Sequence, residues 1–240
     1  RDRTCIVDGR HHLIEWAGPQ HASTIRTIYH GSDLTRFTHV PMPLRGEALR
    51  MLCVGSFYEY KGQRYLIDAC RILRERGVAF ELVLIGEGPL RDELEAKVSE
   101  LGLGDAIRFL GRCSQDEVRA ELESSDMFVL PSVAAAKGLR DGIPNVLVET
   151  MAVGRPLVAS GLDGVRELVE DGVTGLLTEQ RDPVSLADAI QRLADDPALA
   201  EGMVKAGREK VEREHDASVN LDLVWDVFGE LSGDDAPHDD

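Results

Sequence analysis

Basic residues are scarce in this sequence. Its 240 residues include 27 lysines and arginines against 43 aspartates and glutamates, which gives a formal net charge of −16 at pH 7. This balance disfavours a nucleic-acid partner, because proteins hold such a polyanion mainly through lysine and arginine side chains. We therefore expect no nucleic acid among the partners.

Long apolar runs are also absent. No stretch approaches the roughly 20 apolar residues that a membrane-spanning helix needs, and no basic start followed by an apolar segment resembles a secretory signal. Hydrophobic residues still make up 43% of the chain, which is enough for a full core. We expect a globular cytoplasmic protein whose contact with the membrane is at most peripheral, at its inner face.

Cysteine is too sparse and scattered for a zinc site. The four cysteines form no CxxC pair: Cys5, Cys53, Cys70 and Cys113. Cys53 and Cys70 fall in apolar segments, so we expect both to be buried free thiols. Five of the seven histidines precede Leu44, and four of these fall nine residues apart: His12, His21, His30 and His39. Metal ligands are usually closer together, so we interpret this spacing as coincidence on a polar surface and expect no metal.

The two ends of the chain differ from its middle. The first 44 residues are irregular, and Pro41 and Pro43 indicate a linker before a regular pattern begins. The last residues, GDDAPHDD, carry four aspartates and are typical of a solvated, disordered tail. Because the sequence starts at Arg1, with no start-like segment before a clear structural element, we expect a fragment of a longer protein.

Short apolar runs alternate with helical stretches between Leu49 and Thr178. The runs are rich in Val, Ile and Leu, as strands buried on both faces are: LRMLCVGS, FELVLIG, AIRFLG, DMFVLPS, RPLVAS and TGLLT. The predicted helices between them span 62–76, 90–101, 114–125, 145–154 and 163–172. This alternation predicts an α/β fold, a doubly wound parallel sheet of the Rossmann-like type.

Three further helices follow the predicted sheet. Residues 182–195 begin with Asp182 before Pro183, and residues 197–214 begin with Pro197 directly after Asp196; at each start we expect the aspartate side chain to cap the first amides. Residues 217–231 form an amphipathic piece that we expect to pack on another surface, because one face carries Leu221, Val224, Trp225 and Phe228.

The stretch RDGIPNVLVETM, residues 140–151, combines a turn with a largely apolar helix. No lysine or arginine lies three or four positions from Glu149, so a buried Glu149 carboxylate needs a partner from elsewhere. The turn leaves the first helix amides free to bind an anion such as phosphate. A nucleoside diphosphate would meet both demands. The turn contains Gly142, Ile143 and Pro144, and the helix begins with Asn145 and Val146.

Ligands of a doubly wound sheet bind outside the carboxyl ends of its strands, so the loops there are the candidate site. After the first strand, Gly55 and Ser56 open the loop GSFYEYKGQ, which contains Lys61. The phosphate loop of nucleoside triphosphatases needs Gly before this Lys and Ser or Thr after it, so that motif is excluded. Lys61 can still grip phosphate as a point charge; the alternative is a solvated lysine.

Two more loops carry candidate residues. After the second strand, Gly86, Glu87 and Gly88 begin like a dinucleotide-binding turn, but Arg91 stands where the third glycine belongs. Gly86 and Gly88 instead allow a ligand or another backbone to approach closely. Arg112 follows the third strand, where it either reaches a base or phosphate or only starts the next helix.

Asp141 and Glu149 are two carboxylates near the same predicted edge. A glycosidase would place such a pair across the bond that it cuts, and spacing along the chain does not establish that arrangement. A second role fits better. Glu149 would accept hydrogen bonds from a ribose diol, while Asp141 and the turn amides would hold a sugar.

Taken in order, these motifs resemble the C-terminal, donor-binding half of the retaining glycosyltransferases of the GT-B fold, the large family-four group. The resemblance covers Leu49 to Leu177 and is carried by VGSFYEYKG, IGEGPL, FLG, SDMFVLPS, Asp141-x7-Glu149, ETMAVGRPLVAS and DGVRELVEDGVTGLL. The loop SVAAAKGLRDGIPNVLVETMA resembles exopolysaccharide and colanic-acid-type members. YHGSDLTRF resembles the hinge segment between the two halves of such enzymes.

The resemblance implies a division of the chain into four parts. Residues 1–46 would be a remnant of the N-terminal acceptor domain with the hinge linker, and residues 47–215 the nucleotide-sugar-binding domain. Residues 216–231 would be a helix that crosses back to the acceptor half, and residues 232–240 the disordered acidic tail.

The resemblance also implies roles for single residues. Lys61 matches the lysine on the donor diphosphate, Glu149 the acid on the ribose, and Asp141 the first acid of a Glu-x7-Glu pair that contacts the donor sugar. These three are the candidate catalytic residues. The amides of residues 142–146 match the diphosphate cradle, and the base would be enclosed near Gly86, Glu87 and Arg112.

Two positions depart from the family pattern. Asp141 is one methylene shorter than the usual Glu, and Ser56 stands where an arginine often grips phosphate. Our hypothesis is that Lys137 or Arg140 from the long loop replaces that arginine. Unchanged donor affinity in both Lys137→Ala and Arg140→Ala would contradict it.

The activity that the resemblance implies is transfer of a sugar from a nucleotide-diphosphate sugar to an acceptor hydroxyl, with retained anomeric configuration and no metal or other cofactor. The acceptor, a glycan or lipid-linked molecule, would bind through the missing N-terminal domain. Two alternatives stay open: a nucleotide-sugar-binding module that is inactive without its acceptor domain, and a nucleotide-sugar epimerase of the same fold.

Overall fold

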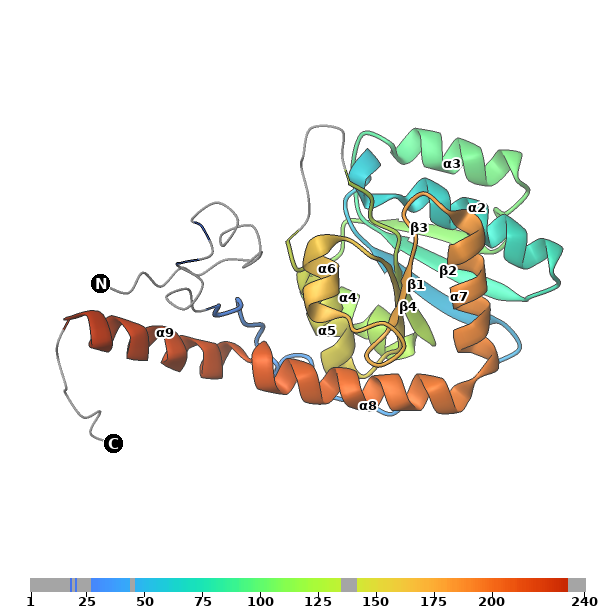
Figure 1. The fold of residues 1–240 in the computed structure, drawn as a ribbon. Coiled ribbons are helices and arrows are strands. Elements are labelled where there is room, and N and C mark those ends of the chain that lie inside the picture. Colours follow the sequence, from blue (N-terminus) through green and yellow to red (C-terminus); the bar gives the residue numbers. More distant parts are fainter. Residues whose placement is uncertain (1–17, 19, 21–26, 44–45, 135–141, 233–240) are drawn as a thin grey trace.

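A computed structural model describes residues 18, 20, 27–43, 46–134 and 142–232 of the chain (Figure 1). Its centre is one parallel sheet of six strands in the order β3-β2-β1-β4-β5-β6. The strands are β1 (Leu49–Val54), β2 (Phe80–Ile85), β3 (Ile107–Gly111), β4 (Met127–Leu130), β5 (Leu157–Ser160) and β6 (Leu176–Thr178). The doubly wound parallel sheet that the sequence predicts is therefore confirmed.

Helices connect consecutive strands, because neighbouring parallel strands need a crossover connection, which is usually helical. They are η2 (Glu59–Lys61), α2 (Gln63–Glu75), α3 (Arg91–Glu100), α4 (Gln115–Ser124), α5 (Asn145–Val153) and α6 (Asp163–Leu168), followed by α7 (Pro183–Asp195), α8 (Pro197–Glu214) and α9 (Ala217–Ser232). The predicted caps of α7 and α8 are confirmed, because the Asp182 carboxylate accepts from two amides and the Asp196 carboxylate from one.

One helix is shorter than its sequence pattern predicts. The pattern extends to residue 172, whereas α6 ends at Leu168 and Val169 is extended. The Glu170 amide donates to the Thr174 hydroxyl at 2.9 Å, and Gly172 adopts a positive φ of 77°. This local turn replaces the last helical turn and leads the chain into β6.

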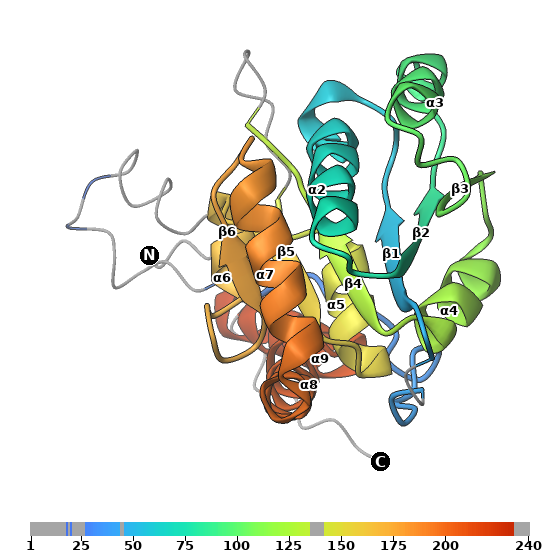
Figure 2. The same ribbon diagram turned by 90° about the vertical axis from the view of Figure 1, so that its right-hand side faces the viewer.

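Two hydrophobic cores cover the two faces of the sheet. The first packs β1–β3 against α2, α3 and α7, and α2 lies beside α7 on this face (Figure 2). The second core packs the other face against α4, α5 and α6, and it includes Leu34 and Phe37 of the segment before the sheet. Cys53 and Cys70 are buried free thiols, as expected, and burial raises the pKa of Cys53 to about 12.

The segment 36–43 lies firmly against the domain. The buried Arg155 guanidinium donates to the carbonyls of Val40 and Pro41, and Arg208 donates to the Phe37 carbonyl at 3.1 Å. Arg36 forms an ion pair of 3.2 Å with Asp116 near the start of α4. The proline-marked linker is thus held at several points along its length.

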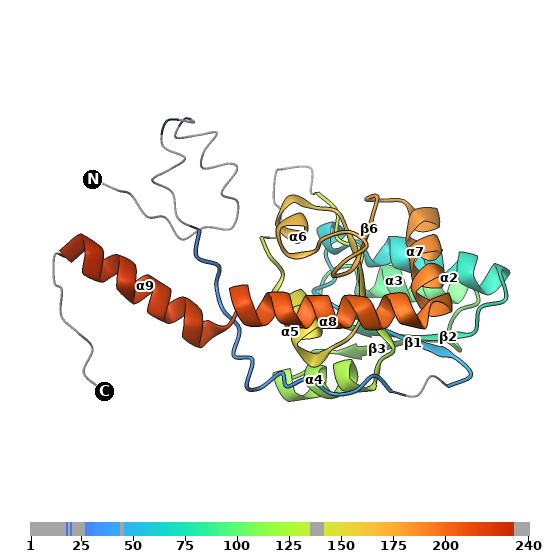
Figure 3. The same cartoon turned by 60° about the horizontal axis from the view of Figure 1, so that its bottom comes forward.

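Helix α9 projects away from the sheet, beyond the end of α8 (Figures 1 and 3). Three of the four apolar residues that the sequence places on one face are largely exposed: Leu221, Trp225 and Phe228. Their expected packing partner is not among the described residues. No helix in the described part of the chain is both long enough and apolar enough to cross a membrane.

Candidate nucleotide-binding site

The strand order reverses between β1 and β4, so the boundary between these two strands is the switch point of the sheet. The chain leaves β1 for α2 on one face of the sheet and leaves β4 for α5 on the other face. Ligands of open α/β sheets bind at such a switch point, outside the carboxyl ends of the strands. The loops after these two strands meet there, because the Val133 amide donates to the Tyr60 carbonyl at 2.7 Å.

Backbone hydrogen bonds join the loops after β1 and β2. The Gly55 amide donates to the Ile85 carbonyl and the Phe57 amide to the Glu87 carbonyl, both at 2.9 Å. A Cβ on Gly86, whose φ is 150°, would overlap the Gly55 carbonyl oxygen. Gly86 and Gly88 thus permit close approach of a backbone, which is one of the two alternatives that the sequence leaves open.

Lys61 stands at the end of η2 and is half-buried. Its side chain runs beside Gly55, and its ammonium lies 5.3 Å from the centre of the Tyr60 ring. Behind this loop, the buried Gln63 side chain donates to the carbonyls of Gly55 and Ser56, each at 3.2 Å. Sequence reasoning missed Gln63, the buried first residue of the amphipathic helix α2.

Glu149 is half-buried in α5 and lies among buried neighbours. Within the described ranges its carboxylate has no hydrogen bond and no ion pair. Burial raises the pKa of Glu149 above its ordinary value of 4.5, and burial is the one cause of that shift. The prediction that Glu149 takes its partner from a ligand remains a prediction.

The start of α5 has no side-chain cap. Pro144 is the N-cap and supplies no side-chain acceptor, in contrast to Asp182 and Asp196 at α7 and α8. The first amides of α5 are therefore not capped by a side chain and can meet a ligand. Gly142 packs against Gly164, where a Cβ would come within 2.6 Å of the Gly142 carbonyl oxygen. Ile143 is buried, and this fixes the turn in front of the helix.

A second residue missed by the sequence analysis lies at this helix start. The His30 ring nitrogen Nε2 donates to the Asn145 side-chain oxygen, although 115 positions separate the two residues. His39 lies at the other end of the same helix, against Gly154. The two described histidines of the nine-residue series are therefore far apart in the fold. The described part of the chain has no group of three potential metal ligands.

The remaining candidates are less closely assembled. Glu87 forms an ion pair of 3.0 Å with Arg91, which also pairs with Glu95, and Arg112 is exposed. A base-binding role for Glu87 or Arg112 stays a prediction. Arg140 and Asp141, together with Lys137, lie outside the described residues.

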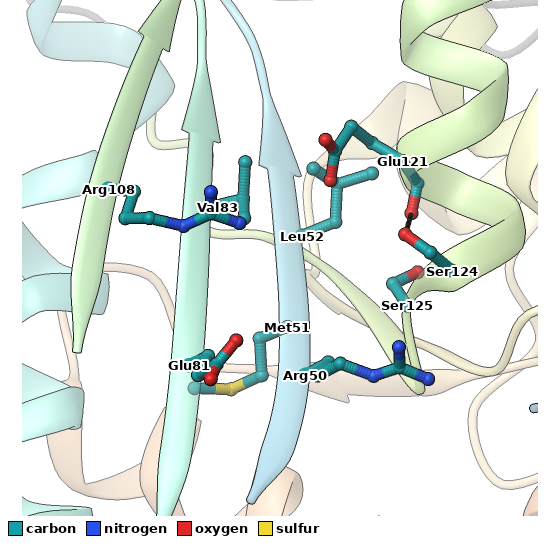
Figure 4. A pocket seen from close by; sticks show the side chains of 9 residues that line it. All are labelled: Arg50, Met51, Leu52, Glu81, Val83, Arg108, Glu121, Ser124 and Ser125. Atoms are coloured by element: carbon teal, nitrogen blue, oxygen red, sulfur yellow. Dashed lines mark hydrogen bonds between the residues drawn. The ribbon is translucent and has the colours of Figure 1, made fainter. Parts of the chain in front are cut away.

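A pocket of about 230 Å³ lies elsewhere on the domain, between the strands β1, β2 and β3 and the end of α4 (Figure 4). Its wall mixes both signs of charge, with two arginines and two glutamates: Arg50, Arg108, Glu81 and Glu121. It is away from the carboxyl ends of the strands, so it is separate from the candidate site at the switch point between β1 and β4.

Comparison with known proteins places the chain in a family. The family "Glycosyl transferases group 1" matches residues 48–196. The chain is 36% identical over 223 residues to the amylovoran biosynthesis glycosyltransferase AmsK of Erwinia amylovora, and this match covers 93% of the chain and 54% of AmsK. It is 39% identical over 194 residues to the putative colanic acid biosynthesis glycosyltransferase WcaL of Escherichia coli, with 79% and 47% covered.

A solved structure shows the same fold. The Anabaena protein HepE in complex with UDP and glucose superimposes with a TM-score of 0.77 over 92% of this chain and 60% of HepE, at 22% identity. The chain belongs to the group 1 glycosyltransferases and has the fold of the C-terminal half of a GT-B enzyme. It spans about half the length of the relatives that it matches.

Proposed function

We propose that this chain is the donor-binding part of a retaining glycosyltransferase that acts in exopolysaccharide synthesis. It would bind a nucleotide-diphosphate sugar, whose sugar passes to a hydroxyl of a glycan or lipid-linked acceptor. The observation that carries the proposal is Glu149, a half-buried carboxylate without a described partner that follows an uncapped helix start at the switch point of the sheet. The names of AmsK and WcaL support the pathway, and the UDP held by HepE supports the ligand class.

The chemistry of the proposal follows from where charge develops. When the bond to the sugar breaks, negative charge builds on the departing diphosphate. Lys61 and the first amides of α5 would stabilise that charge, because cations and helix N-termini lower the energy of a developing anion. Glu149 would accept hydrogen bonds from the ribose hydroxyls and so fix the nucleotide. Asp141 would contact the donor sugar.

Binding measurements on the purified chain test this assignment. We expect Lys61→Ala and Glu149→Gln each to weaken binding of a nucleoside diphosphate by about 1–3 kcal/mol, the scale for losing a charged hydrogen bond. Lys205→Ala and Glu209→Gln are matched controls, since both residues are exposed on α8. Calorimetry that gives wild-type affinity for both site variants would overturn the assignment.

The base and the sugar are open to a direct screen. Thermal shifts with uridine, guanosine and adenosine diphosphate sugars should identify the donor, because a bound ligand stabilises the fold in proportion to the logarithm of its concentration over Kd. No metal takes part in the proposed binding. Addition of a chelator should therefore leave the donor affinity unchanged, and a loss of affinity would contradict this.

The half-length match to the relatives favours a binding module as the second candidate. Without an acceptor domain, the chain would bind the donor and transfer nothing. Transfer of sugar to an acceptor by this chain alone would refute that prediction. An epimerase of the same fold would instead form a new nucleotide product without any acceptor.

A further inference from the structure

Two distant parts of the chain meet beside the candidate site. The Ser32 amide donates to the His215 carbonyl at 2.8 Å, and Ser32 forms a parallel bridge with Asp216, where α8 gives way to α9. The Asn220 side chain donates to the carbonyls of Tyr29 and Glu214, each at 2.8 Å. The segment 29–32 is therefore fixed to the junction of α8 and α9.

Aromatic contacts orient His30 within this segment. The buried His215 ring stacks on Tyr29, with ring centres 4.9 Å apart, and meets the edge of the His30 ring at 6.5 Å. From this position His30 Nε2 reaches the Asn145 oxygen. The hydrogen bond thus connects a fixed part of the linker to the first residue of α5.

The direction of the hydrogen bond determines what Asn145 can offer to a ligand. A side-chain amide has one acceptor oxygen and one NH₂ donor group, and His30 occupies the oxygen. The NH₂ group has no hydrogen bond within the described residues. An amide held in the opposite orientation would present an oxygen, which repels an anion. The bond from His30 therefore selects the orientation in which Asn145 has a donor to spare.

We propose that His30 is a positioning residue of the donor site: it holds the Asn145 amide so that its NH₂ group, together with the first amides of α5, donates to the diphosphate. This inference rests on the proposed function of the same site. His30 acts through Asn145 and needs no contact with the ligand itself.

His39 provides the internal control. Both histidines belong to the segment before the sheet and both touch α5, His30 at the first residue of the helix and His39 at its C-cap glycine. A general loosening of the linker from α5 would follow from truncation of either residue. A specific effect on the diphosphate would follow from truncation of His30 alone.

Calorimetry with uridine, guanosine and adenosine diphosphate on the whole chain provides the test. For the diphosphate that binds, we expect His30→Ala and Asn145→Ala each to weaken binding about tenfold, near the loss of one hydrogen bond. The double variant should lose no more than either single variant, since both remove the same interaction. His30→Gln, which keeps an N–H donor, should recover part of the affinity, and His39→Ala should bind as the wild type does.

Asn145→Asp sharpens the test, because it keeps the acceptor for His30 and replaces the donor with a negative oxygen. It should bind more weakly than Asn145→Ala. Wild-type affinity in His30→Ala, independent losses that add in the double variant, or an equal loss in His39→Ala would each overturn the inference. If the wild-type chain binds none of the three diphosphates, the proposed function itself fails. If the wild type binds and Lys61→Ala weakens binding while His30→Ala does not, the site is correctly assigned and only the inference about His30 fails.

Discussion

Two charged side chains in or next to α5 differ in how the fold compensates their burial. Arg155, two residues after the helix, is buried and donates to five carbonyl oxygens, which belong to Val40, Pro41, Leu122, Glu123 and Gly154. Glu149, inside the helix, is half-buried and has no hydrogen bond or ion pair among the residues described. One charge is satisfied by the fold, and the other is not.

The difference separates a structural charge from a functional one. Arg155 uses all five of its N–H donors and joins α4, α5 and the linker into one unit. Glu149 carries the cost of burial without compensation, which destabilises the ligand-free domain. Such a cost is typical of groups whose partner is a ligand, because binding sites are often less stable than the rest of a fold. Changes at these two positions should therefore have opposite effects on stability.

The largest expected effect is at Arg155. Arg155→Met keeps most of the side-chain volume but leaves five carbonyls without their donor, so the free energy of unfolding should fall by about 3–5 kcal/mol. Chemical denaturation measures this loss. Arg71→Met is the control, because Arg71 forms an exposed pair with Glu75 on α2 and should cost at most about 0.5 kcal/mol. If Arg155→Met and Arg71→Met lose the same free energy of unfolding, Arg155 has no special structural role.

A substitution at Glu149 should have the opposite effect and stabilise the ligand-free chain. Glu149→Gln should raise the free energy of unfolding of the ligand-free chain by about 1 kcal/mol at pH 7, since an uncompensated charge is removed. The folded-state pKa of Glu149 is raised, so the wild type gains stability as the pH falls through that pKa toward 4.5. The difference in the free energy of unfolding between Glu149→Gln and the wild type should therefore become smaller as the pH falls toward 4.5. A variant less stable than the wild type at pH 7 would mean that the carboxylate already has a partner in the fold.

His215, at the junction of α8 and α9, should have a smaller effect on stability. Burial lowers the pKa of His215 below its ordinary value of 6.5. The unfolded chain then binds the proton more readily, so stability is fully present above pH 6.5 and falls as the pH drops below it. His215→Phe keeps a ring against Tyr29 but does not titrate. Thermal unfolding at pH 7.5 and 5.5 should show a smaller drop in this variant, and an equal drop would contradict the assignment.

The sequence predicts the sheet well because each strand and helix has a strong local pattern. Val, Ile and Leu runs define the strands, and aspartates before prolines define the starts of α7 and α8. The end of α6 is the exception, since the turn at Glu170 and Thr174 depends on a side-chain hydrogen bond rather than on periodicity.

The site is only partly predictable in the same way. Lys61 and Glu149 lie in recognisable motifs, which follow β1 and β4, the two strands on either side of the switch point of the sheet. His30 and Arg155 also stand in recognisable motifs, YHGSDLTRF and ETMAVGRPLVAS, but these motifs do not predict their roles, which depend on residues more than 100 positions away in the chain. Only the packing of the linker against α5 reveals them.

The central claim is that Glu149 stays uncompensated until a nucleotide binds. Carbon-detected NMR titration of the Glu149 carboxyl group, with and without a saturating nucleoside diphosphate, tests it most directly. We expect a pKa above 4.5 in the free chain and a clear decrease in the complex, because ribose hydroxyls that donate to the carboxylate favour its charged form. A pKa that stays the same while the ligand is bound would contradict the claim.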